Sequence, residues 1–302
     1  MNIIMGIIKL ARPHQWVKNI FVFPVLVFSG SILQFEQVIL TLVAFAAFCL
    51  ASSSVYFLND YKDIDEDKKH PTKRFRPLAS GTVPKWMGLA GSLVLGALAI
   101  AVPAFYLNPP TMWVVCFYLL LNILYSLGLK HLVIIDVLVI ASGFVLRILA
   151  GATALYIMPS PWLVLCAVML SLFLAFTKRR AEVIALGDKA AQHRKVLAHY
   201  SPMFLDQMIS IVTASTVLGY VLYTVDDRTT AIVGSRLLLL SVPFVLYCIF
   251  RYLYLIYQID AEDGNHTRTI FTDIPMLISG GIWGILCTII VLFGSEIGDL
   301  IP

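Results

Sequence analysis

The chain has 302 residues, of which 59% are hydrophobic and only 13% are charged, and its formal net charge is +4. Because soluble globular domains are about a quarter charged, this composition excludes an ordinary soluble protein. We expect an all-α polytopic membrane protein, because helices satisfy their own backbone groups in lipid, organised as a single integral-membrane domain over residues 1–302.

Apolar stretches that can cross a hydrocarbon core about 30 Å thick contain about 20 helical residues. The sequence predicts nine such spans, at about 18–33, 37–58, 86–107, 111–127, 132–157, 161–178, 203–224, 236–257 and 274–294. The first span lacks a convincing small-residue cleavage site, so we expect no cleaved signal peptide. The five cysteines fall in different spans, and we expect them to pack as small apolar residues rather than form a disulfide or zinc site.

Charged residues gather on one side of this arrangement. With the N-terminus in the cytoplasm, most of the 22 lysines and arginines lie on the cytoplasmic side. The positive-inside rule therefore predicts a cytoplasmic N-terminus and an outer C-terminus. Most acidic residues fall on the same side, while the opposite connections at about 34–36, 108–110 and 158–160 are short. We expect a multi-pass protein of the cell membrane, inner or plasma, whose active site faces the cytoplasm.

The connection after the second predicted span begins LNDYKDIDEDKK. Asp60, Asp63 and Asp67 are spaced i, i+3, i+7, which places them on one face of a helix. Asn59 is four residues before Asp63, so its carbonyl can join the same group, and Tyr56 lies one turn earlier. The spacing therefore predicts a cluster of oxygen ligands at the end of a membrane helix.

Carboxylate and amide oxygens without His or Cys suit a hard cation such as Mg²⁺, which usually binds one or two carboxylates plus substrate phosphates. A solvated acidic loop is the alternative. Stacked carboxylates repel each other, and this run continues a membrane helix, so we favour the metal site. Asp65 and Glu66 point away from the shared face and are expected to be solvated.

The same connection continues with the basic run TKRFRP. Lys73, Arg74 and Arg76 can return toward the acidic cluster. For Lys73 and Arg76 we predict phosphate contact, because Arg binds phosphate in a bidentate manner and Lys acts as a point charge. Positive-inside topology is the alternative, and it is the preferred explanation of Lys68 and Lys69.

The fifth predicted span contains ionisable residues. Asp136 begins the span and Arg147 follows about three turns, or about 16 Å, later on nearly the same face. An ionisable residue inside a span is functional by default, because a central charge costs at least about 2.5–3.5 kcal/mol. We predict a polar pocket with Arg147 receiving an anion at depth and with Tyr125 and Lys130 at the cytoplasmic turn; a structural Asp–Arg or Arg–carbonyl pair is the alternative. Arg251 lies in another span without a neighbouring pattern, and we expect it to snorkel or pack.

The sixth predicted span ends in the sequence FTKRRAEV. An ion pair between Lys178 and Glu182, and cations that complement the helix macrodipole, would explain these charges structurally. The other interpretation is that Lys178, Arg179 and Arg180 form a second anion-binding cluster.

The pattern NDxxDxxxD at Asn59, Asp60, Asp63 and Asp67 resembles the UbiA superfamily of intramembrane prenyltransferases. This resemblance implies a nine-helix bundle in which two cytoplasmic polar loops hold Mg²⁺ and a diphosphate over a membrane pocket. Four segments in order look like one branch of it, the decaprenyl-phosphate phosphoribosyltransferases: RPHQWVKN at 12–19, NDYKDIDEDKKHPTKRFRPLASG at 59–81, the YSLGLKH…D…ASGFVLR run at 125–147 and LAFTKRRAEV at 174–183.

The branch resemblance implies a glycosyltransferase of the EC 2.4.2 type that moves 5-phosphoribosyl from phosphoribosyl diphosphate to a polyprenyl (decaprenyl) phosphate, for a lipid-linked cell-envelope sugar precursor. One difference from ordinary UbiA prenyltransferases supports a phosphoribosyl diphosphate donor. Those proteins carry a second DxxxD-like acidic motif after the sixth span, and this sequence has KRRAE there. Phosphoribosyl diphosphate carries a 5-phosphate as well as a diphosphate, and the acceptor is itself a phosphate. One acidic Mg²⁺ site cannot neutralise all of these groups, so added cations fit this donor.

The resemblance and the charge pattern imply roles for individual residues. Asn59 and Asp63 would hold Mg²⁺, with Asp60 or Asp67 assisting, so that the three aspartates form the catalytic group. The substrate-binding candidates are Lys18, Tyr56, Lys73, Arg76, Tyr125, Lys130, Asp136, Arg147, Lys178, Arg179 and Arg180. We expect no general base, because the attacking phosphate oxygen is already anionic near neutral pH.

Three rival functions are weighed against this one. An aromatic prenyltransferase of the UbiA type would use a prenyl diphosphate donor, and KRRAE counts against it. A transporter or lipid flippase would carry charges near the bilayer midplane and often internal repeats or broken helices, and no convincing repeat is present. A purely structural membrane protein leaves Arg147 and the clustered carboxylates unexplained. We expect no nucleic-acid partner, and homo-oligomerisation is left open.

Overall fold

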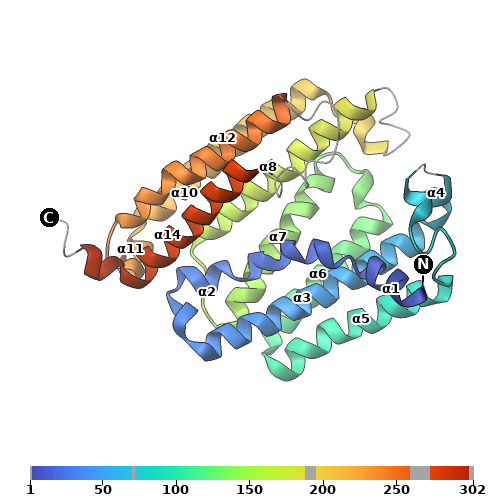
Figure 1. Ribbon diagram of the computed structural model, residues 1–302, viewed down its shortest axis with the longest axis horizontal. Coiled ribbons are helices and arrows are strands. Elements are labelled where there is room, and N and C mark those ends of the chain that lie inside the picture. Colours follow the sequence, from blue (N-terminus) through green and yellow to red (C-terminus); the bar gives the residue numbers. More distant parts are fainter. Residues whose placement is uncertain (1, 70–71, 188–194, 259–272, 299–302) are drawn as a thin grey trace. The chain divides into compact units, whose positions relative to one another are not determined.

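The computed structural model describes residues 2–69, 72–187, 195–258 and 273–298 (Figure 1). Within these ranges all regular secondary structure is helical, which confirms the all-α prediction. Eight helices in the described ranges are long and apolar enough to cross a membrane. They are α3 (Phe35–Lys62), α5 (Lys85–Tyr106), α6 (Pro109–Leu127), α7 (Ile135–Ala154), α8 (Pro161–Leu186), α10 (Pro202–Val225), α12 (Val242–Gln258) with the preceding η7 (Leu237–Ser241), and α14 (Ile274–Gly298).

The first predicted span is not one helix. Residues 18–33 fall in η1 (Pro13–Val22), α2 (Pro24–Phe28) and η2 (Ser31–Leu33). Pro24 cannot donate a backbone hydrogen bond to the preceding turn, and Gly30 adopts a left-handed φ of 73°, which separates α2 from η2. The prediction of nine continuous spans is therefore corrected to eight in the part of the chain that the structure describes, while the side of the N-terminus stays a prediction.

Contacts divide the chain into two compact units: unit 1 comprises residues 1–26, 32–127 and 146–158, and unit 2 comprises 27–31, 128–145 and 159–302. The single domain expected over the whole chain stays a prediction. The remaining short elements are α1 (Ile3–Ala11), α4 (Ile64–Lys69) and η3 (Lys73–Phe75) in unit 1, and η4 (Leu129–His131), η6 (Lys195–His199) and α11 (Asp227–Val233) in unit 2.

In unit 1, α3 and α5 run side by side and α6 packs on both (Figure 1). Two small residues join α3 to α5. The hydroxyl of Ser54 donates to the backbone carbonyl of Ser92 at 2.7 Å, and the hydroxyl of Ser92 donates to that of Ser54 at 3.0 Å. The core around Phe48 includes Val22, Val115 and Leu146, which come from η1, α6 and the second part of α7. This packing brings η1 to α3, whose last turns carry Asn59 and Asp60.

In unit 2, α8 packs along α10 and α12 packs along α14 (Figure 1). Serine caps begin the first two helices: Ser160 accepts a hydrogen bond from the amide of Trp162, and Ser201 from that of Phe204. Proline follows each cap, where its missing N–H costs nothing. A core around Phe173 and Tyr252 joins α8 and α12 to the first part of α7.

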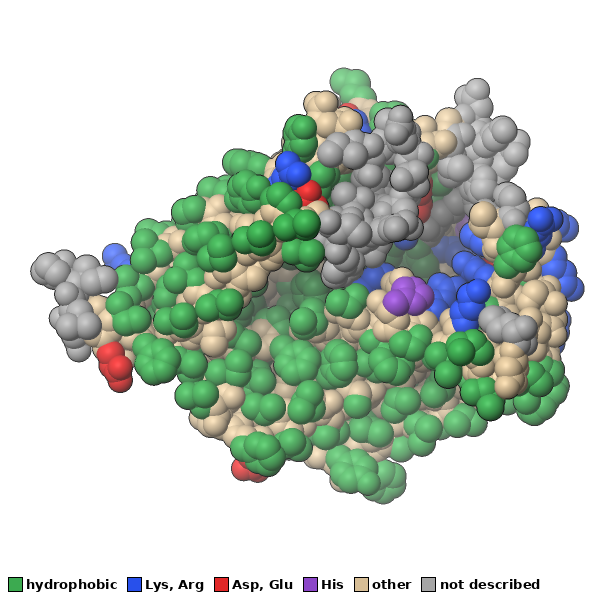
Figure 2. Space-filling model, in the orientation of Figure 1, with side chains coloured by type: hydrophobic (Ala, Val, Ile, Leu, Met, Phe, Trp, Pro, Cys, Tyr) green, Lys and Arg blue, Asp and Glu red, His purple; other side chains and the backbone are tan. Residues whose placement is uncertain are grey.

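Hydrophobic side chains cover the flanks of the long helices, as expected for surfaces that face lipid (Figure 2). Lys and Arg side chains instead gather at the end of unit 1 that carries α4 (Figure 2). These lysines and arginines of unit 1 therefore lie at helix ends rather than along the lipid-facing flanks.

Candidate functional site

The acidic residues of unit 1 lie where α3 passes into α4. Asn59 and Asp60 belong to the last turns of α3, Asp63 is its C-cap, and Asp67 is in α4. The amide of Asp63 donates to the carbonyl of Asn59 at 2.9 Å, and the amide of Asp67 to that of Asp63 at 2.7 Å, so the helical spacing continues through the cap. Asp60 and Asp67 are both buried, while Asp65 and Glu66 are exposed, which confirms the predicted face.

Two arginines hold this acidic face. Arg12 Nη2 lies 2.6 Å from Asp60 Oδ1, and Arg76 Nη1 lies 3.1 Å from the same oxygen and 2.7 Å from Asp67 Oδ2. The predicted return of Arg76 to the acidic cluster is confirmed. Arg12 was missed as a site residue, although it is the first residue of the RPHQWVKN segment, because no local pattern links it to an aspartate 48 positions later.

Neighbouring polar groups fix the end of α3. The Ser126 hydroxyl donates to Asn59 Oδ1 at 2.5 Å, and Lys62 Nζ donates to the carbonyl of Ser126 at 3.0 Å. The guanidinium of Arg12 lies over the ring of Tyr56, 4.9 Å from its centroid. These contacts tie α3 to the end of α6 and place Tyr56 beside the acidic cluster.

The donor set suits a hard cation, although it is not a complete cage of acidic ligands. In the described residues no group of three or more His, Cys, Asp or Glu side chains converges to hold an ion. The cluster offers only carboxylate and amide oxygens, and Mg²⁺ characteristically takes one or two carboxylates and completes its octahedron with water and substrate phosphates. The residues therefore fit Mg²⁺ when a phosphorylated substrate supplies the other ligands.

A second polar group of unit 1 surrounds Arg147, which is buried. Its Nε donates to Asn19 Oδ1 at 2.8 Å and its Nη2 to the hydroxyl of Tyr118 at 3.2 Å. The guanidinium also lies over the rings of Tyr118 and Phe48, 5.0 and 5.7 Å from their centroids. Asn19 was missed by sequence reasoning, but it is the last residue of the RPHQWVKN segment and orients the guanidinium.

Asp136 and Arg147 were predicted to share a helix face, but their contacts differ. Asp136, in unit 2, accepts hydrogen bonds from Arg179 Nε at 2.8 Å and from the Tyr200 hydroxyl at 2.7 Å. Asp136 therefore forms a structural pair with an arginine of α8, Arg179, and not with Arg147, which the sequence suggested. Burial, together with the hydrogen bond to Asp136, raises the pKa of Tyr200 to about 12, so its hydroxyl keeps its proton and donates.

The basic residues at the end of α8 are paired with acids of unit 2. Arg179 Nη1 lies 2.6 Å from Glu182 Oε2, and Lys178 Nζ lies 3.9 Å from Glu182 Oε1, as the i, i+4 spacing allowed. Arg180 Nε lies 2.5 Å from Asp206 Oδ1. These pairs neutralise part of the charge that the KRR sequence carries.

The prediction for Arg251 is wrong. This residue was expected to snorkel or pack without a specific partner, but its Nε and Nη2 bind the two oxygens of Asp273 at 3.2 and 2.8 Å. Asp273 also caps α14, since its Oδ1 accepts from the amide of Met276 at 2.9 Å. The interaction joins α12 to the start of α14 and was not visible in a local sequence pattern.

The remaining predicted residues differ in exposure. Lys73 is exposed at the start of η3, whereas Lys18, Tyr125 and Lys130 are partly buried. Lys18 lies in η1 and Lys130 in η4, so both belong to 3₁₀ helices rather than to the long helices. Exposure of this degree leaves each residue accessible from solvent.

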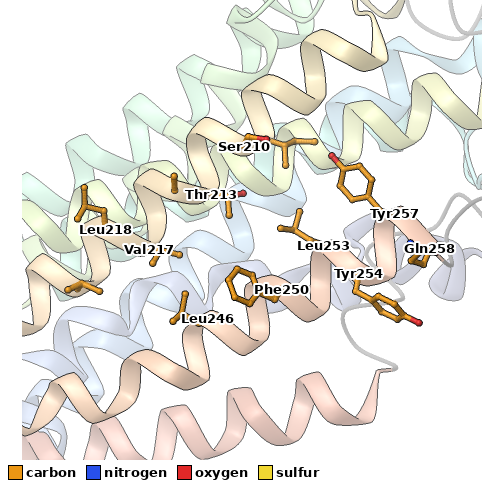
Figure 3. A pocket seen from close by; sticks show the side chains of 13 residues that line it. Ser210, Thr213, Val217, Leu218, Leu246, Phe250, Leu253, Tyr254, Tyr257 and Gln258 are labelled. Atoms are coloured by element: carbon orange, nitrogen blue, oxygen red, sulfur yellow. The ribbon is translucent and has the colours of Figure 1, made fainter.

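A groove of about 840 Å³ lies between α10 and α12 in unit 2 (Figure 3). Side chains such as Val217, Leu246 and Phe250 line most of it, and Ser210, Tyr257 and Gln258 lie toward one end. None of the predicted site residues lines this groove, so the charged clusters and this apolar groove are separate features.

Comparison with known proteins agrees with the sequence resemblance. The family model described as "UbiA prenyltransferase family" matches residues 20–280. Proteins named decaprenyl-phosphate phosphoribosyltransferase from Corynebacterium glutamicum and Mycolicibacterium smegmatis are each 35% identical to this chain; both alignments cover 83% of the chain, and 76% and 82% of the respective relatives. A relative of the same name from Mycobacterium tuberculosis is also 35% identical, with 83% of both proteins covered.

Solved structures show the same fold. A UbiA homolog from Archaeoglobus fulgidus bound to DMAPP and Mg²⁺ matches with a TM-score of 0.66 and 17% identity, over 98% of this chain and all of that one. The same homolog bound to GPP and Mg²⁺ matches with a TM-score of 0.67 and 17% identity, over 96% and 98% of the two chains.

Proposed function

Because the chain belongs to the UbiA prenyltransferase family, we propose that it transfers 5-phosphoribosyl from phosphoribosyl diphosphate to a polyprenyl phosphate, such as decaprenyl phosphate. The observation that carries the proposal is the 35% identity, over 83% of the chain, with relatives that bear this name. The product would be a lipid-linked precursor of a cell-envelope sugar. The enzyme would work at the cytoplasmic face of the cell membrane, with its N-terminus in the cytoplasm.

Asn59 and Asp63 would hold Mg²⁺, with Asp60 or Asp67 assisting. When bound, the ion would neutralise negative charge on the leaving diphosphate. The neighbouring arginines are suited to the same anion: Arg12 and Arg76 are partly exposed, and both pair with Asp60. A diphosphate in this cluster would exchange carboxylate contacts for charge-assisted contacts to phosphate.

The donor would be oriented by the residues around this cluster. Tyr56 is beside Arg12, and Lys18 and Lys73 are accessible cations of unit 1. In the reaction the bond from ribose C1 to the diphosphate oxygen breaks, and a polyprenyl phosphate oxygen forms the new bond to C1. Positive charge develops on the sugar and negative charge on the diphosphate, so fixed cations stabilise the transition state. No base is needed, because the attacking oxygen is already anionic.

Lys130 and Arg147 would bind the phosphate of the lipid acceptor, whose tail lies in the bilayer. Lys178 and Arg180 would add positive charge for the donor. Arg179, enclosed between Asp136 and Glu182, would hold Asp136 in place, and Tyr125 and Asp136 would shape the polar surroundings. The main work of the protein in this scheme is to hold two anions together that otherwise repel each other.

A competition assay with purified protein and two labelled donors tests the proposal. With Mg²⁺ and polyprenyl phosphate present, label should pass from phosphoribosyl diphosphate to the lipid, and chelation should stop it. The protein should transfer no prenyl group from a labelled prenyl diphosphate. Transfer of a prenyl group to an aromatic acceptor, without phosphoribosyl transfer, would instead establish the aromatic prenyltransferase function.

A further inference from the structure

The turn that precedes α7 contains an unfavourable backbone conformation. Ile134 has a φ of 68°, in the left-handed region that β-branched residues avoid because Cβ collides with the backbone. Such a conformation persists only where surrounding contacts hold it. The side chain of Ile134 is 42% exposed, so its own packing does not supply the whole of that restraint.

Tyr200 supplies a specific contact to this residue. Its hydroxyl accepts a hydrogen bond from the amide of Ile134 at 2.7 Å and donates one to Asp136 Oδ1, also at 2.7 Å. One oxygen atom therefore joins the strained residue to the first turn of α7. Tyr200 is 4% exposed and its ring stacks on Phe204. Stacking therefore restrains the ring, and the two hydrogen bonds restrain the hydroxyl.

The acceptor of this hydroxyl is itself fixed. Asp136 is fully buried, and its second oxygen accepts from Arg179 Nε, while the same guanidinium binds Glu182. The network runs from α8 through Asp136 to the hydroxyl and ends on the backbone of Ile134. Buried polar networks in which every member is satisfied define one geometry, because any displacement leaves a buried group without its partner.

The restrained turn also carries a cation. Backbone hydrogen bonds join η4 to α7 without a gap: the amide of Leu132 donates to the carbonyl of Leu129 at 3.1 Å, and the amide of Asp136 to that of Leu132 at 3.0 Å. Lys130 lies in η4, inside this bonded segment. A shift at Ile134 therefore moves the backbone from which Lys130 projects.

We propose that Tyr200 is a positioning residue whose hydroxyl, anchored on Asp136, fixes the turn at Ile134 and thereby the place of Lys130. The inference rests on the proposed function in one respect, namely that Lys130 binds the phosphate of the lipid acceptor. Arg179 acts in this scheme through Asp136 rather than on a substrate. The tyrosine was not singled out by the sequence, because it lies outside the predicted spans.

The test is Tyr200→Phe, which removes one oxygen atom and keeps the ring that stacks on Phe204. The KM for polyprenyl phosphate should rise about tenfold, the loss expected for one hydrogen bond in a buried network, while the KM for phosphoribosyl diphosphate stays unchanged. Amide exchange should become faster in residues 129–135. Adding Ile134→Asn should restore part of the acceptor KM, because Asn accepts the left-handed region more readily than Ile.

The matched control is Tyr220→Phe, which also removes a buried hydroxyl of unit 2, one bonded to Ser241 and Trp283. It should lower stability without a selective change in either KM. The proposal is overturned if Tyr200→Phe raises both KM values equally, if it behaves like the control, or if exchange in 129–135 is unchanged.

Two further outcomes are decided by exchange alone. If Tyr200→Phe does not fold, the Ile134 amide of the unmodified protein must exchange slowly; exchange as fast as that of an open turn refutes the restraint. If the unmodified protein transfers no phosphoribosyl group, the proposed function fails, and the exchange of residues 129–135 in Tyr200→Phe still decides the role of the hydroxyl.

Discussion

Unit 1 and unit 2 each hold a cluster in which arginines pair with carboxylates, and the two clusters differ in how deeply the arginines are buried. In unit 1 the side chains of Arg12 and Arg76 are 24% and 28% exposed beside Asp60. In unit 2 the side chain of Arg179 is only 2% exposed between Asp136 and Glu182. The arginines are thus partly exposed in one unit and enclosed in the other, whereas the carboxylates Asp60 and Asp136 are buried in both.

The difference in arginine exposure indicates which cluster is suited to binding a ligand and which to holding the structure. An arginine that water reaches can exchange a carboxylate for a phosphate more easily than an enclosed one, because its own charge stays partly solvated during the exchange. An arginine that is fully enclosed cannot leave, because its partner would remain as a buried unpaired charge. The cluster of unit 1 is therefore suited to ligand exchange, and that of unit 2 to holding a fixed geometry.

The largest expected effect is on the acidic cluster itself. Asp63→Ala should reduce transfer by about a thousandfold or more, because it removes a ligand of the ion that stabilises the departing diphosphate. Initial rates at saturating Mg²⁺ and both substrates measure it. Asp65→Ala is the control, since that side chain is 87% exposed and contacts only Lys68, at 3.8 Å, among the pairs observed. A near-normal rate in Asp63→Ala would show that the metal assignment is wrong.

A pair of arginine variants tests the contrast between the units directly. Arg179→Ala should destabilise the protein by about 3–5 kcal/mol, because Asp136 is then left buried and unpaired. Arg76→Ala should cost less than Arg179→Ala, because Asp60 keeps its pair with Arg12 and the Arg76 side chain is 28% exposed, and yet it should lower transfer strongly. Denaturant unfolding in detergent and initial rates provide the two readings. Equal losses of stability in the two variants would remove the distinction between an exchangeable and a fixed arginine.

Much of the fold could be predicted because length and apolarity are local properties. The span expected at 203–224 is α10 at Pro202–Val225, and serine and proline mark its start. The span expected at 18–33 failed because Pro24 and Gly30 lie inside an apolar run that hydropathy alone reads as continuous. Apolar composition predicts residence in lipid, whereas backbone chemistry decides whether a helix continues.

Only the part of the site that depends on helical spacing between nearby residues could be predicted from the sequence. The i, i+7 spacing indicated that Asp60 and Asp67 share a face, and Arg76 binds both. Partners distant in sequence could not be assigned: Arg12 is 48 residues from Asp60, and Tyr200 is 64 residues from Asp136. No periodicity encodes which distant residue fills a buried contact, because that depends on how the helices pack.

Packing of η1 offers a third test, with an intermediate effect confined to unit 1. A Cβ added at Gly151 would lie 2.0 Å from the carbonyl oxygen of Val22, so η1 must move in Gly151→Ala. We expect a loss of about 1–3 kcal/mol in stability, the usual cost of overpacking, and weaker substrate binding, because Lys18 and Asn19 lie in η1. Unfolding and KM measurements test this.

The control for Gly151→Ala is Gly284→Ala in α14, where an added Cβ meets nothing within 4 Å. Alanine is favoured over glycine in a helix interior by about 1 kcal/mol, so this variant should be neutral or slightly stabilising. If both variants behave alike, the contact between η1 and α7 does not support the site of unit 1.

The smallest effect concerns a third arginine–carboxylate pair, between Arg251 and Asp273. Hydrogen bonds from Arg251 hold the pKa of Asp273 below its ordinary value of 3.8. Folding therefore favours the ionised carboxylate, and this stabilisation is complete above the ordinary value and is lost as the pH falls through the lowered one. Asp273→Asn should lower the Tm modestly at pH 7, since the Arg251 side chain is 29% exposed, and should differ less from the parent near pH 3.

Thermal unfolding of parent and Asp273→Asn between pH 7 and pH 3 measures this difference, with Asp65→Asn as the exposed control that should follow the parent throughout. If the gap in Tm is as wide at pH 3 as at pH 7, the charge of Asp273 is not the source of the difference, because Asn keeps an oxygen that can accept from the amide of Met276. A gap at pH 7 as large as that of Arg179→Ala would mean that exposure of the arginine does not set the strength of these pairs, and the contrast between the two units would fail with it.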